Sequence, residues 1–88
     1  MKDREIFERI VEEIDRARQK HPPFHSNHEA YAVIKEEFEE WWDSVKADEP
    51  DPKELLSVAA MAVLALMELP YEALTVRNSI SPIYDAIE

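Results

Sequence analysis

The chain contains no glycine and no cysteine among its 88 residues. The lack of glycine disfavours glycine-rich phosphate loops and dinucleotide-binding fingerprints, and it removes the usual residue of tight hairpin turns. The lack of cysteine excludes disulfides, thiolate metal sites and thiol nucleophiles. These absences favour an all-α fold, and a reducing cytoplasm is the expected location.

Positive charge is also scarce, since 10 Lys and Arg stand against 20 Asp and Glu, for a formal net charge of −10. This balance argues against direct binding of nucleic acid and against docking on an anionic membrane. The longest apolar run, residues 55–67, is broken only by Ser57 and is too short to cross a bilayer. Charges throughout residues 1–20 predict that there is no signal peptide. The acidic balance is compatible with binding cations, or phosphates that arrive with a cation.

Apolar periodicity and helix-start residues predict three helices. Ser26 and Glu29 form a capping box ahead of the second helix. Asp51 and Pro52 suit the N-cap and the first position of the third helix, which Pro70 ends. The expected helices are at about residues 3–20, 27–47 and 52–69, with one or two short helical segments within 71–88.

Residues 1–88 are expected to form a single domain, an antiparallel helical bundle. The third helix is apolar nearly all round, which predicts a central helix covered on every side. A chain of this length buries only about 60–65% of its unfolded surface. We therefore expect the bundle to be completed by a second copy, as a homodimer or a homotetramer.

Helix geometry, at about 100° per residue, sorts the side chains of the second helix by face. One sector contains large apolar residues and is the expected core face: Tyr31, Ile34, Phe38, Trp41 and Val45. Glu39 points away from this sector, whereas Glu37 and Glu40 form an i, i+3 pair at its margin. On the third helix, Glu54 and Ser57 are the polar residues of one side over the first two turns, and Glu68 follows on that side.

If these two helix faces meet, Glu37, Glu40 and Glu54 converge. Three hard oxygen donors suit Mg²⁺ or Mn²⁺, with water and substrate phosphates completing the coordination. The alternative is that the glutamates only form a solvated face. His21, His25 and His28 fit no zinc signature, and loop and capping roles are expected for them.

Two short motifs resemble a known enzyme family. The stretch EEFEEW, residues 36–41, resembles the E-E-x-x-E-L signature of the MazG-like all-α nucleoside triphosphate pyrophosphohydrolases. The stretch ELLSVAAMA, residues 54–62, is similar to their second signature, E-L-x-D followed by an apolar run. The resemblance covers about residues 20–69, and this stretch is similar to the small phage- or prophage-type members.

The resemblance implies that Mg²⁺ is bound by the two acidic pairs and that a nucleotide is cleaved to a monophosphate and pyrophosphate. The matching metal ligands are Glu37, Glu40 and Glu54, and Glu36 is the adjoining acid that would orient water. The Asp of the second signature falls on Ser57, which carries no negative charge and cannot act as a carboxylate base. Phosphate-binding residues of the family lie on a later helix, where this chain offers Arg77 and Asn78 without a convincing match in register.

The sequence therefore predicts an Mg²⁺-dependent nucleotide pyrophosphohydrolase. The alternative, motivated by Ser57 and by a tail with few cations, is a bundle that retained the fold but lost catalysis and acts as a binding or scaffolding module.

Overall fold

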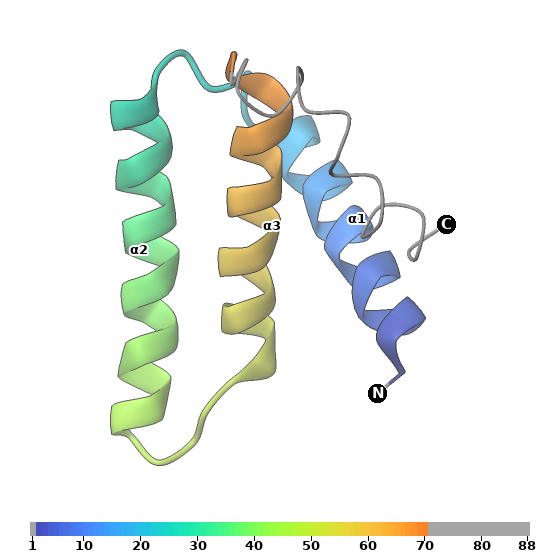
Figure 1. The fold of residues 1–88 in the computed structure, drawn as a ribbon. Helices are drawn as coiled ribbons and strands as arrows, with labels where there is room; N and C mark the ends of the chain where they lie inside the picture. Colours follow the sequence, from blue (N-terminus) through green and yellow to red (C-terminus); the bar gives the residue numbers. More distant parts are fainter. Residues whose placement is uncertain (1, 71–88) are drawn as a thin grey trace, which may run out of the picture.

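The computed structural model describes residues 2–70, which form three helices joined by two short loops (Figure 1). Helix α1 is Asp3–Lys20, α2 is Asn27–Lys46 and α3 is Pro52–Glu68. No strand occurs within residues 2–70. The short helical segments expected within 71–88, together with Arg77 and Asn78, lie outside the described residues.

The starts of α2 and α3 are fixed by the side chains that the sequence indicated. Ser26 Oγ accepts a hydrogen bond from the Glu29 backbone N–H at 3.1 Å. The Glu29 carboxylate accepts from the His25 N–H at 2.9 Å, one residue earlier than a capping box would place this contact. At α3, Asp51 Oδ1 accepts from the Lys53 N–H at 2.9 Å, so orphan donors of both helix starts are satisfied.

The end of α2 is a Schellman-type cap that turns the chain back toward α3. Asp48 adopts a left-handed φ of 60° and donates its N–H to the Val45 carbonyl at 3.0 Å. The Glu49 N–H bonds to the Ser44 carbonyl, also at 3.0 Å. This pair of bonds usually places glycine in the left-handed position, which the chain fills with aspartate. The Ser44 hydroxyl accepts from the Asp51 N–H at 3.1 Å, which ties the loop to both helices.

Helix α3 lies between α1 and α2 and packs against both, so the chain is a compact all-α three-helix bundle (Figure 1). One group of buried side chains joins α1 to α3: Ile14, Ala60, Met61 and Leu64. A second group joins α2 to the end of α3: Ala30, Ala65 and Leu69. Phe24, in the loop before α2, contacts both groups and closes that end of the bundle.

The core face predicted for α2 is wrong in part. Tyr31 and Phe38 were expected inside, but they are 65% and 51% exposed. Ala30 is buried instead, and Val33 and Glu37 are half-buried beside it. The prediction selected the sector richest in large apolar side chains, whereas the stripe that α3 covers is set by how the two helices cross.

The central position of α3 agrees with its sequence, but residues 2–70 alone do not cover this helix on every side. Large apolar side chains remain exposed on all three helices: Ile6, Phe7 and Val11 on α1, Tyr31, Phe38 and Trp42 on α2, and Leu55, Val63, Leu66 and Met67 on α3. A homodimer or homotetramer that covers them stays a prediction. Within residues 2–70, no helix combines the length and the apolar character needed to cross a membrane.

Candidate functional site

Three carboxylates from two helices converge at the loop-connected end of α2 and α3. Glu37 and Glu40 lie one turn apart on α2, and Glu54 lies in the first turn of α3. One carboxylate oxygen of each lies within 4.8 Å of the others. The convergence follows from the i, i+3 spacing on α2 and from the chain reversal that brings the start of α3 alongside it. We call these three residues the acidic triad.

The acidic triad is electrostatically unfavourable as it stands. Burial raises the pKa of Glu37 above its ordinary value, and the neighbouring charges of Glu40 and Glu54 raise it further. The pKa of Glu54 is also raised, first by burial and then by its hydrogen bond to Glu40 and by the charge of Glu40. Among the described residues, no Lys, Arg or His side chain forms an ion pair with any of the three. Its negative charge is therefore uncompensated by protein groups there.

The donor set and its spacing fit a divalent cation. Oxygens that share an ion lie at most twice the metal–oxygen distance apart, which is about 4.2 Å for Mg²⁺ and about 4.6–5.2 Å for Ca²⁺. The observed limit of 4.8 Å lies within the upper bound for Ca²⁺, and Mg²⁺ requires the widest pair to close by at least about 0.6 Å. Rotation of a glutamate side chain supplies a movement of that size. Mg²⁺ commonly takes only one or two carboxylates and leaves its other positions to water and phosphate.

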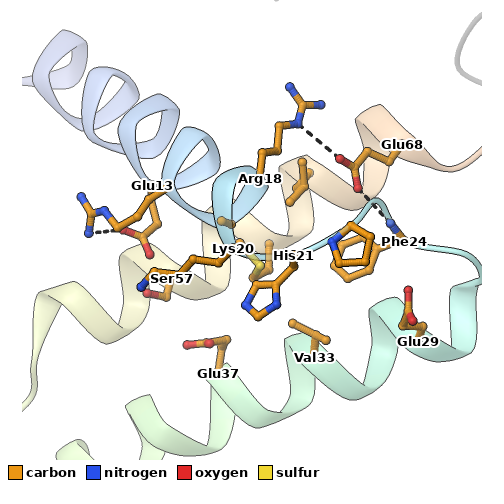
Figure 2. A pocket seen from close by; sticks show the side chains of 15 residues that line it. Glu13, Arg18, Lys20, His21, Phe24, Glu29, Val33, Glu37, Ser57 and Glu68 are labelled. Carbon is orange, nitrogen blue, oxygen red and sulfur yellow. Dashed lines mark hydrogen bonds and ion pairs between the residues drawn. The ribbon is translucent and has the colours of Figure 1, made fainter.

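A cleft of about 350 Å³ lies between α1, the loop after it, α2 and α3, and Glu37 is the residue of the acidic triad that lines it (Figure 2). This volume lies within the range of small-molecule pockets. Glu37 and Ser57 face the cleft at one end, and Phe24, Glu29 and Glu68 line the other (Figure 2). Its apolar lining comes from Ala17, Phe24, Val33, Met61 and Leu64.

The remaining residues singled out by the sequence are placed as follows. Ser57 is half-buried one turn after Glu54, and it lines the cleft together with Glu37. Glu36 is exposed and lines a different, shallow hollow on α2, outside the acidic triad. Glu39 is exposed and pairs with Lys35 at 3.8 Å, as its orientation away from the core predicted. Arg77 and Asn78 lie outside residues 2–70, so their contacts are not described.

Helix α1 supplies cleft residues that the sequence reasoning missed. Glu13 and Lys20 line the cleft, and the charge of Glu13 contributes to raising the pKa of Glu37. The loop residue His21 projects into the same space (Figure 2). Glu13 and Lys20 are seven residues apart and therefore share one side of a helix, beside the apolar stripe that contains Ala17. That spacing could have marked them as a pair, but only the packing of α1 on α3 shows which surface they face.

Comparison of this chain with protein-family models, with curated proteins and with solved structures finds no match. The resemblance to the MazG-like enzymes therefore rests on the two acidic motifs. In the structure, Glu37 and Glu40 of the first motif and Glu54 of the second form one cluster, and Glu37 also lines the cleft.

Proposed function

We propose that this protein is an Mg²⁺-dependent nucleotide pyrophosphohydrolase of the MazG-like type. The observation that carries the proposal is the acidic triad, which joins the two motifs at the end of a cleft large enough for part of a nucleotide. The reaction adds one water molecule across the bridge between the α- and β-phosphates of a nucleoside triphosphate. The products are a nucleoside monophosphate and pyrophosphate.

In this proposal, Glu37, Glu40 and Glu54 hold the metal at the end of the cleft. When bound, Mg²⁺ would supply the positive charge that phosphoryl transfer requires. The Ser57 hydroxyl faces the cleft and can donate a hydrogen bond to a phosphate oxygen. The apolar lining around Phe24 and Val33 offers a surface for the nucleobase and excludes water from that end.

The role proposed for Glu36, orientation of the attacking water, is separable from metal binding. Glu36 lies next to Glu37 in the chain, but its side chain lines a shallow hollow on α2 that Glu40 of the acidic triad also lines. Glu36→Gln tests this role directly. A base role predicts a large loss of turnover with unchanged metal affinity, and unchanged turnover would remove Glu36 from the reaction.

The proposal is tested by measuring pyrophosphate release from a panel of ribo- and deoxyribonucleoside triphosphates at millimolar Mg²⁺. Glu40→Gln should lower the rate by about 100-fold or more, because it removes a metal ligand while keeping the shape of the side chain. Glu39→Gln is the matched control, since Glu39 lies on the same helix but is exposed and outside the acidic triad. Absence of release with every nucleotide would overturn the enzymatic proposal.

Ser57 favours a second candidate, a bundle that binds a nucleotide or a partner without catalysis. A serine at this position leaves the site one carboxylate short of the family pattern. Under this candidate, nucleotide with Mg²⁺ raises the melting temperature, whereas no pyrophosphate appears even after prolonged incubation. Measuring both quantities on the same sample separates the two functions.

We also propose that the protein self-associates through its exposed apolar side chains, which include Leu55 and Leu66 on α3. Light scattering coupled to size-exclusion chromatography measures the mass directly. A homodimer or homotetramer supports this proposal, and a monomer at tens of micromolar protein would contradict it.

A further inference from the structure

The charged side chains that line the cleft are mostly paired with one another. Arg16 bonds to Glu13 at 2.9 Å, and Arg18 Nε bonds to Glu68 at 3.2 Å. The carboxylate of Glu29 accepts from the His25 N–H. Within the described part of the chain, this leaves Lys20 and His21 as the cleft cation and imidazole whose side chains form no hydrogen bond or ion pair. Glu37 is the cleft carboxylate that has neither.

These unpaired groups line the same cleft and come from different elements. In Figure 2 the Lys20 side chain extends from the last turn of α1 toward the α3 side of the cleft, where Ser57 lies. The His21 ring projects into the cleft above Val33 and on the side where Glu37 lies. A ligand that filled this end of the cleft would therefore meet Glu37 of the acidic triad on α2 and the side chains of Lys20 and His21 on α1 and the loop after it.

We infer that Lys20 and His21 are the phosphate-binding residues of the cleft and contact the phosphates of a nucleotide whose metal ion is held by the acidic triad. The inference rests on the proposed function, and it places the cationic contribution on the first helix and the loop after it. An anion held between Mg²⁺ and Lys20 gains charge-assisted hydrogen bonds at both ends. A phosphate chain has the required charge and oxygens, whereas the overall charge of −10 would repel an anion from most of the surface.

A purely structural explanation of Lys20 makes a different prediction. A lysine in the last turn of a helix stabilises the negative end of the helix dipole, and Arg18 and Lys20 both occupy that turn. If Lys20 has only that role, neutralising it lowers the stability of the ligand-free protein and leaves the affinity for an anion unchanged. The two explanations are therefore separated by a binding measurement.

The experiment measures the affinity of inorganic pyrophosphate and of a non-hydrolysable α,β-imido deoxynucleoside triphosphate, each in saturating Mg²⁺, by isothermal titration calorimetry. The variants are Lys20→Gln, His21→Asn and the double variant, and Lys35→Gln is the matched control on the opposite side of α2. Lys20→Gln should lower the affinity for both probes by about tenfold or more, and the double variant should lower it further. The response to Mg²⁺ alone, followed by melting temperature, should stay unchanged in every variant.

The outcomes distinguish this inference from the proposed function. If Lys20→Gln and the double variant bind both probes as tightly as the parent protein, the phosphates lie elsewhere and the inference is wrong, although the metal site stands. An equal loss in Lys35→Gln would show a general charge effect and would also overturn it. If the parent responds to Mg²⁺ but binds neither probe, the inference fails and the metal-binding bundle remains. If the parent shows no response to Mg²⁺, with or without the probes, the proposed function fails and the inference fails with it.

Discussion

Each end of α3 carries a half-buried glutamate, and the two glutamates have opposite surroundings. Near the end of the helix, the Glu68 carboxylate accepts from Arg18 Nε at 3.2 Å and from the Phe24 N–H at 3.1 Å. Near its start, Glu54 lies beside Glu37 and Glu40, and no described cationic side chain reaches it. One glutamate ties α1 and the loop after it to α3, while the other adds to a cluster of like charge.

The two ends of α3 therefore differ in their effect on folding. A paired carboxylate that is only 10% exposed contributes to folding, because its partners on α1 and in the loop are held in place. Gathered carboxylates without a partner oppose folding, because burial and mutual repulsion both disfavour their charged form. This arrangement is compatible with the metal-binding role proposed for the acidic triad.

The largest expected effect on stability comes from removing the contacts of Glu68. Glu68→Ala leaves the Phe24 N–H and the Arg18 guanidinium without their acceptor, so the free energy of unfolding should fall by about 1–3 kcal/mol. Urea unfolding followed by circular dichroism measures this change. Glu12→Ala is the control, because Glu12 is exposed on α1 with no described partner. An effect of Glu68→Ala no larger than that of Glu12→Ala would show that the contact does not hold α1 in place.

A smaller effect, on the affinity for Mg²⁺, should come from adding a carboxylate at position 57. Ser57→Asp adds a fourth carboxylate beside Glu37, so Mg²⁺ should bind about tenfold more tightly, while the metal-free protein becomes less stable. Ser57→Asn has a side chain of the same size without the charge. It should change neither the affinity for Mg²⁺ nor the stability of the metal-free protein. Calorimetric titration of Mg²⁺ into the three proteins measures the affinities. Equal affinities in the parent and Ser57→Asp would place Ser57 too far from the metal to matter.

The smallest effect concerns the pH dependence of the metal-free protein. Because the pKa of Glu37 is raised in the folded state, its ionised form costs stability above that pKa, and the cost disappears as pH falls toward the ordinary value of 4.5. Glu37→Gln removes the charge at every pH. It should therefore stabilise the protein at pH 7 by about 0.5 kcal/mol, the size of one like-charge repulsion, which corresponds to about 2–4 °C in melting temperature.

The measurement is the difference in melting temperature between Glu37→Gln and the parent across a pH series without divalent metal. The difference should shrink on acidification and vanish below pH 4.5. Glu39→Gln is the matched control, since Glu39 is exposed on the same helix and lies outside the acidic triad. A Glu37→Gln protein that is less stable than the parent at pH 7 would mean that this carboxylate is already compensated.

The sequence predicted those parts of the fold that depend on local chemistry. The starts of α2 and α3 follow from Ser26 and from Asp51-Pro52, whose capping roles are set within a few residues. The meeting of Glu37 and Glu40 with Glu54 also followed from local rules, namely helix periodicity and a short loop that forces neighbouring helices to run antiparallel.

The parts that failed depend on how the helices pack. Tyr31 and Phe38 were expected in the core because they are large and apolar, but the crossing of α2 and α3 buries Ala30 instead. The side chains of Glu13 and Lys20 were missed because nothing near them in the sequence says which neighbour α1 meets. Helix periodicity gives the relative directions of side chains on one helix, whereas the packing of the helices decides which neighbour each side chain faces.

The most direct test of the account is a titration of Mg²⁺ followed by melting temperature, on the parent, Glu40→Gln and Glu39→Gln. A metal that binds only the folded state stabilises it by about 2.7 kcal/mol at a hundredfold excess over its dissociation constant. The account predicts a saturable rise for the parent and for Glu39→Gln, and none for Glu40→Gln. A flat titration of the parent, or the same rise in Glu40→Gln, would contradict the assignment of the acidic triad as a metal site.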